Sequence, residues 1–193
     1  MNKIISVFSV FLLTFVLSGL FLHTSYAQQM QEQMGDEMHE MSEEVHEVKT
    51  FDLFWPVAAG KVPGDNLYFL KGLKEKLREI FIFNPYNKAD YNIVLAEKRM
   101  AEAEKLLLEN KDISHFEQSL QIAQSKREKA ISLIKEVKGK GQDVSSLVNR
   151  LQSSIEKQTN LLKFWKTKGI DGAQSAIDKD LNNLQSDSSN LQS

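Results

Sequence analysis

The sequence predicts an all-α protein, an antiparallel helical bundle of about four to five helices with coiled-coil-like packing. Apolar residues recur at spacings of three and four over most of residues 67–191, and no segment of useful length alternates as a strand would. The 193 residues include only 3 prolines and 9 glycines, a composition that favours long helices. The near-heptad spacing indicates helices that pack at small crossing angles.

The first two expected helices are separated by Asn84-Pro85. The first follows Asp65, a candidate N-cap, and ends before Pro85, because the residue that precedes a proline disfavours helical geometry. The second covers about 88–110 and carries strong helix formers on its exposed side. Each contributes an apolar stripe to the expected bundle: Leu67, Leu70, Leu73, Leu77, Ile80 and Phe81 in the first, and Ile93, Ala96, Met100, Ala103 and Leu107 in the second.

Three more helices are expected after these. Ser114 and Glu117 form a capping box that predicts the start of the third, and Arg127 interrupts its apolar seam where an apolar residue is due. Asp143 is expected to cap the fourth helix after a glycine-containing break. The fifth helix is weaker, and the polar residues 186–193 after it are expected to fray.

The N-terminal residues have the pattern of a secretory signal. Lys3 precedes an uncharged apolar run from Ile4 to Leu22, and Ser25 and Ala27 supply the small residues that signal peptidase requires. We expect a signal peptide over 1–27 with the cut after Ala27. The alternative is an uncleaved membrane anchor, because the run approaches the ~20 apolar residues that span a bilayer. Both interpretations predict an exported protein, secreted or associated with the cell envelope.

An acidic arm is expected over 28–50. It carries seven acidic residues and one lysine, a net charge of −6, whereas the 22 basic and 19 acidic residues from Phe51 onward give +3. Polar, acidic segments with few aromatic residues stay unfolded or marginally helical, so the arm is interpreted as a solvated spacer. The alternative, that it folds back on basic helices, is weakened by screening at physiological salt.

The arm also contains the one cluster that suits a metal. Thioether and imidazole groups are ligands of copper, Cu(I) especially. The alternative function is therefore extracytoplasmic copper handling through Met34, Met38, His39, Met41 and His46.

The sequence gives little support for a catalytic site. The chain has no cysteine, which excludes disulfides, thiolate metal sites and thiol nucleophiles. Only His39, His46 and His115 remain after the expected cut, and no phosphate-binding loop is present. The sequence predicts a protein that is not an enzyme, with no catalytic residues and no cofactor.

Several short motifs follow one another in an order that is distinctive. They are Phe54-Trp55-Pro56, Pro63-Gly64-Asp65, Leu67-Tyr68, Leu70-Lys71, Lys74-Glu75, Leu77, Phe83-Asn84-Pro85 and the run from Leu95 to Ala103. This stretch, 54–107, resembles a bacterial extracytoplasmic helical family of unknown function, found in candidate-phyla lineages and in Gram-positive surface proteins. The chain departs from the family with Asn84 for aspartate and Met100 for leucine. The resemblance implies an exported helical domain and supplies no activity.

The motif positions are interpreted as structural rather than as a ligand site, because aromatic clusters at helical spacing are mostly core. Trp55 and Pro56 are candidates to cover one end of the first helix pair. The full set of motif positions is Trp55, Pro56, Pro63, Asp65, Leu67, Tyr68, Pro85 and Arg99.

The predicted organisation places the bundle domain at 51–185, with 51–65 as an ordered loop at its start. The predicted function is binding or scaffolding at the cell envelope. The expected partners are an envelope protein, the anionic cell-wall or membrane surface, or a second copy through helix faces; the small basic excess argues against nucleic acid. The first helix is the candidate anionic contact, through Lys71, Lys74, Lys76 and Arg78, and the favoured alternative is that these residues form a solvated helix face.

Overall fold

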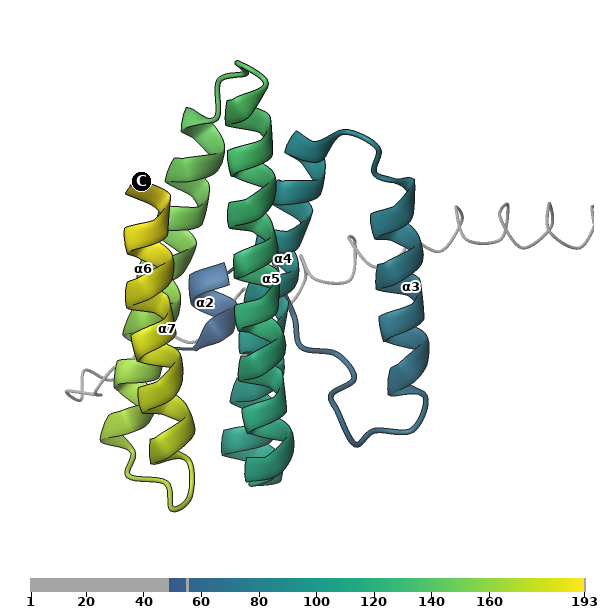
Figure 1. Cartoon of the computed structure of the whole chain (residues 1–193). Coiled ribbons are helices and arrows are strands. Elements are labelled where there is room, and N and C mark those ends of the chain that lie inside the picture. The colour runs from purple at the N-terminus through teal and green to yellow at the C-terminus, as the bar shows by residue number, and fades with distance from the viewer. Residues whose placement is uncertain (1–48, 55, 193) are drawn as a thin grey trace, which may run out of the picture. The chain divides into compact units, whose positions relative to one another are not determined.

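The computed structural model describes residues 49–54 and 56–192 (Figure 1). The expected signal peptide, nearly all of the acidic arm and Trp55 lie outside these residues. The described residues form helices joined by short loops and contain no strand, which confirms the prediction of an all-α helical bundle. The elements are α2 (Thr50–Phe54), α3 (Tyr68–Phe81), α4 (Pro85–Lys105), a π-helical turn (Leu106–Asn110), α5 (Ile113–Gly139), α6 (Ser145–Thr167) and α7 (Gln174–Gln192).

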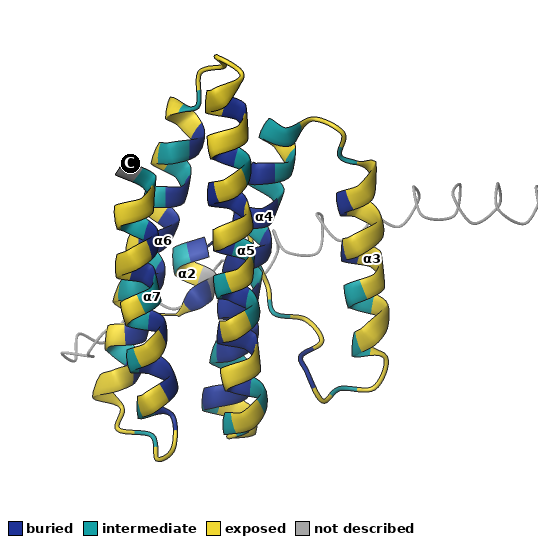
Figure 2. Ribbon diagram, in the orientation of Figure 1, coloured by how far each residue is buried: buried dark blue, intermediate teal, exposed yellow. Residues whose placement is uncertain are grey.

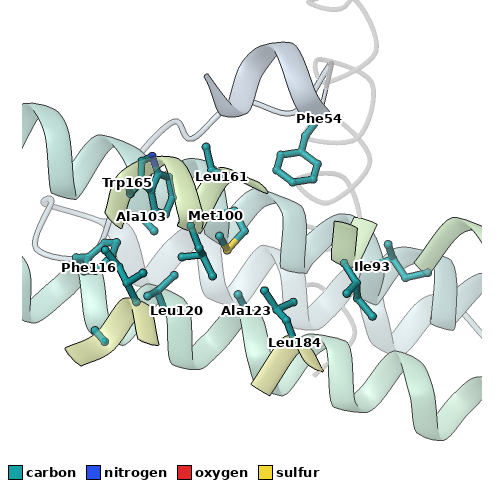
Figure 3. Close-up of a cluster of buried hydrophobic side chains, with 14 of the residues drawn as sticks. Phe54, Ile93, Met100, Ala103, Phe116, Leu120, Ala123, Leu161, Trp165 and Leu184 are labelled. Carbon is teal, nitrogen blue, oxygen red and sulfur yellow. The ribbon is translucent and has the colours of Figure 1, made fainter. Parts of the chain in front are cut away.

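The long helices α4, α5, α6 and α7 form the bundle, and each runs antiparallel to the helix before it (Figure 1). Their apolar faces meet in one core (Figure 3). In this core Phe116 of α5 and Trp165 of α6 pack edge to face, with ring centroids 5.9 Å apart. Phe54 at the end of α2 is buried in the same cluster. Most of the stripe predicted for the second helix therefore lies in the core.

The predicted break at Asn84-Pro85 is confirmed, but α4 begins at Pro85 rather than at about 88. Asn84 caps α4 by accepting from the backbone N–H of Tyr86 at 2.9 Å, and Pro85 occupies the first helical position, where its missing N–H costs nothing. The capping box at Ser114 and Glu117 is wrong. Asp112 is the cap of α5 instead, and its side chain accepts from the backbone N–H of His115 at 3.1 Å.

The start of α3 also differs from expectation. Asp65 does not cap it: the Asp65 carboxylate accepts from the Val62 N–H at 2.8 Å and closes the preceding turn. The helix begins after Leu67, which has a left-handed φ of 66° and no side-chain cap. The segment 51–65, predicted to be a loop, begins inside a helix, α2. This helix starts at Thr50, one residue before the predicted domain boundary at Phe51. The Thr50 N–H donates to Glu104 on α4 at 3.0 Å, so the ordered domain includes Thr50.

Arg127, which interrupts the seam of α5, is completely buried between α5, α6 and α7. It donates to Asp180 at 2.6 Å, to Asp187 at 2.8 Å and to the Gln158 side-chain oxygen at 2.8 Å. Asp187 belongs to the segment expected to fray. That expectation is wrong, because α7 continues to Gln192 and its last turns hold the carboxylate that Arg127 requires.

Candidate functional site

Helix α3 lies beside α4 and is exposed along most of its length (Figure 2). Its large hydrophobic side chains are exposed and its two glutamates meet the bundle, an arrangement that we call reversed. In the part of the chain that the structure describes, every exposed large hydrophobic side chain lies between positions 67 and 83, while Glu75 and Glu79 of α3 are each only 8 % exposed. The apolar stripe predicted for the first helix therefore does not join the core. The exposed side chains are Leu67, Phe69, Leu70, Leu73, Leu77, Ile80, Phe81 and Phe83.

Helical periodicity separates the two faces of α3. Leu70, Leu73, Leu77 and Ile80 follow one another at spacings of three and four, so they share one side of the helix. With Phe69 and Phe81 beside them, they form what we call the outward face. The opposite side carries Tyr68, Lys71, Glu75 and Glu79, and these side chains meet α4 and α5.

Arg99 of α4 is the centre of the α3–α4 contact and is almost fully buried. Its guanidinium forms ion pairs with Glu75 of α3 and with Glu102, one turn further along α4. It also donates to the Tyr68 hydroxyl at 3.0 Å, and that hydroxyl donates to Glu102 at 3.0 Å. Burial, reinforced by the Glu102 carboxylate, raises the pKa of the Tyr68 phenol well above its ordinary value, so the phenol keeps its proton.

Lys71 ties the start of α3 to the loop before it. Its ammonium donates to the carbonyls of Ala59 at 2.6 Å and Lys61 at 2.7 Å and forms an ion pair with Glu102. Burial lowers the pKa of Lys71, while the bond with Glu102 acts in the opposite direction. Lys71 is thus engaged inside the protein, and its predicted role as an anionic-surface contact is wrong. Lys74, Lys76 and Arg78 remain exposed.

Glu79 anchors the other end of α3. It accepts from the Asn92 amide of α4 at 3.0 Å, and Lys126 and Lys129 of α5 approach it at 3.4 Å and 2.5 Å. Burial by itself would raise the pKa of Glu79, but the bonds from Lys129 and Asn92 outweigh it and lower the pKa to about 2. The carboxylate is therefore ionised at neutral pH, and charge pairing holds both ends of α3.

The turn before α3 accounts for further motif positions. Pro63 is buried, and Gly64 has a φ of +92° that favours glycine. A Cβ at Gly64 would come within 3.3 Å of the His115 ring, whose Nδ1 lies 2.6 Å from the Asp112 carboxylate. The turn thus packs its backbone against the start of α5.

The motif positions divide into three groups. Pro63, Asp65, Tyr68, Pro85 and Arg99 have the structural contacts given above. Pro56 and Leu67 are exposed, so neither is a core residue, and Trp55 lies outside the described residues. The sequence pattern does not identify the partners on the far side of the contact, Glu102 and Asn92. The sequence signal for this contact is helical spacing, which places Glu75 and Glu79 on the same face of the helix as Tyr68 and Lys71.

The predicted copper ligands Met34, Met38, His39, Met41 and His46 all lie outside the described residues. Residues 49–54 and 56–192 contain no group of three or more histidine or carboxylate side chains arranged to hold a metal ion. Over the same residues no helix is both long and apolar enough to cross a membrane. The arrangement that stands out chemically is the reversed helix.

A family model described as a domain of unknown function, DUF5667, matches residues 60–190, which include the whole reversed helix and nearly all of the bundle. The match agrees with the resemblance to a domain family of unknown function. No curated protein and no solved structure matches the chain.

Proposed function

We propose that this chain, which belongs to the DUF5667 family, is a non-enzymatic binding module of the cell envelope whose contact surface is the outward face of α3. One observation carries the proposal: α3 buries its glutamates and exposes its leucines. The apolar N-terminal run and the small residues before Gln28 support export, and with it a site of action at the envelope.

The energetics of α3 favour an interaction surface. Burying a large apolar side chain stabilises a protein by about 1.5–3 kcal/mol, so an isolated bundle would gain by turning this stripe inward. Burying charged groups is costly unless each is paired, and replacing such pairs by apolar residues is often neutral or stabilising. The chain has the costlier arrangement, with Glu75 and Glu79 inside and Leu73 and Leu77 outside. Contiguous exposed apolar patches of this kind mark binding surfaces.

The test measures whether the outward face is covered in the native envelope. Because the sequence contains no cysteine, a single introduced cysteine reports on one position. We expect Leu77→Cys to react rapidly with a water-soluble maleimide in the purified protein and slowly in intact envelopes. The matched control is Lys163→Cys on the exposed side of α6, which should react at similar rates in both.

This readout is local to α3, so it does not depend on whether the N-terminal segment is cleaved. Equal reactivity of the Leu77→Cys protein in envelopes and in solution would contradict the proposal. Protection of both positions would also contradict it, because a specific contact surface predicts protection at α3 alone.

A further inference from the structure

We infer that the partner of the outward face is an anionic lipid bilayer, on whose surface α3 lies with its apolar side chains in the headgroup region. The inference rests on the proposed binding role of α3 and names its partner. Three features of the described residues support it: the composition of the outward face, the charge at its edges, and the way the bundle holds the helix.

The outward face has the composition of an interfacial helix. Such helices combine an apolar face with lysine or arginine at its edges and lie in the plane of the membrane surface. On α3 the apolar residues from Phe69 to Phe81 fill one side, and Lys74 and Lys76 stand at its two edges. Lysine stems extend along apolar material while their ammonium groups reach the phosphates, so both edges suit a bilayer.

The charge exposed by α3 has one sign. The helix contains two acidic residues, Glu75 and Glu79, and both are buried against α4 and α5. Its exposed charged residues are Lys74, Lys76 and Arg78, all basic. The reversal of α3 therefore removes every carboxylate of the helix from the exposed side, and the remaining surface is complementary to an anionic layer.

The same charge distribution disfavours a second copy as the partner. Two outward faces brought together would place Lys74 and Lys76 of one protomer against the same lysines of the other. Neither face carries a carboxylate to pair with them, and like charges across an interface cost free energy. An anionic bilayer supplies the missing negative charge together with an apolar phase.

The protein side of α3 suits this geometry as well. In a free interfacial helix the polar face meets water, whereas here it meets Arg99, Lys129 and Asn92. These bonds hold the outward face in place before any contact is made, so binding needs little ordering of the helix. The bundle acts as a rigid support for a membrane-contacting helix.

The test uses the whole chain purified after export, with a polarity-sensitive dye on a single cysteine. Vesicles of phosphatidylcholine alone and of phosphatidylcholine with phosphatidylglycerol are the probes. We expect the dye on Leu77→Cys to shift to the blue with the anionic vesicles and to shift little with the neutral ones. The dye on Lys163→Cys should show neither shift. This control distinguishes contact through α3 from attachment of the whole chain through its apolar N-terminal run.

Charge variants in the labelled chain give the size of the effect. One lysine near an anionic surface contributes a factor of about five in affinity. Removing two should therefore weaken the affinity that the dye at position 77 reports by roughly 30-fold. We therefore expect Lys74→Gln/Lys76→Gln to raise the half-saturating lipid concentration by about this factor. The matched control, Lys138→Gln/Lys163→Gln on the bundle, changes net charge equally and should leave it within about two-fold.

Each outcome decides between partners. No shift with anionic vesicles, together with protection of position 77 in native envelopes, overturns the lipid inference, assigns the face to an envelope protein and leaves the binding role standing. A dye that is already shielded in the absence of vesicles also overturns the lipid inference. In that case, a mass in light scattering that rises with protein concentration indicates a second copy as the partner. A constant mass indicates that another part of the chain covers the outward face. No shift and no protection overturn both proposals.

Discussion

The guanidinium of Arg99 on α4 bonds the carboxylate of Glu75 on α3, and both side chains lie almost wholly out of solvent. The two residues are 24 positions apart in the sequence. Together with the contacts of Tyr68 and Glu79, this pair turns the charged side of α3 toward the bundle and its leucines outward.

Leucines on α3 and in the core should differ sharply in their contribution to stability. Leu77 is 47 % exposed, whereas Leu151 on α6 is fully buried. We expect Leu77→Ala to lower the free energy of unfolding by less than about 1 kcal/mol and Leu151→Ala to lower it by about 2–5 kcal/mol. Urea unfolding followed by circular dichroism measures both. A cost at Leu77 as large as that at Leu151 would show that the stripe is core after all.

Removing Arg99 should release α3 while the bundle stays folded. Arg99→Met leaves Glu75 and Glu102 buried with fewer partners, a change that typically costs about 3–5 kcal/mol. We expect hydrogen exchange to become faster mainly over 68–81. The control is Arg150→Met, because Arg150 binds Glu97 at 2.7 and 2.9 Å in a pair that does not involve α3. Selective loss of protection in α3 with this control as well would contradict the role given to Arg99.

Acid should weaken the attachment of α3 through Glu79. Its pKa falls from an ordinary 4.5 to about 2 in the folded protein, so the folded state prefers the ionised carboxylate. The stabilisation is therefore complete above the unfolded pKa and is lost as pH falls from 4.5 toward 2. Melting temperatures over this range should fall less steeply for Glu79→Gln than for the wild type. Parallel curves would exclude Glu79 as the titrating group.

Arg127 should contribute to stability mainly by pairing with the buried carboxylates that surround it. Arg127→Met leaves Asp180 and Asp187 buried without their cation, and we expect a loss of about 3–5 kcal/mol. Adding Asp180→Asn and Asp187→Asn removes the unpaired charges and should recover at least half of that loss. The comparison is made by urea unfolding of the single and triple variants. A triple variant that is less stable than the single one would argue against charge burial as the cause.

The C-terminal turns of α7 should also contribute to stability. A chain that ends at Gln185 lacks Asp187, which bonds Arg127, and Leu191, which packs against the core. We expect its melting temperature to fall by several degrees, since about 1 kcal/mol shifts the melting of a domain of this size by ~2–8 °C. A chain that ends at Leu191 keeps both residues and is the control. Equal melting temperatures of the two truncated chains would support the sequence-based expectation that residues 186–193 fray.

Local sequence signals were sufficient for the all-α class and for the main chain breaks. Pro85 ends one helix and begins the next because a proline restricts the residue before it and lacks an N–H, and both effects act on neighbours in the sequence. The stripe through Met100 is buried as its periodicity predicts, because apolar spacing and burial agree there. Arg127 was visible as an interruption of such a seam, although its partners on α7 were not.

Only the tertiary structure decided which side of α3 faces the bundle. Periodicity shows that Leu73 and Glu75 lie on opposite sides of one helix, and both orientations satisfy it equally. The choice depends on Arg99 and Lys126, which lie 24 and 47 positions from the glutamates that they bind. Spacing within a helix carries no information about such distant partners. The folded chain pairs these buried charges, which would otherwise carry the full cost of leaving water, and leaves the leucines exposed.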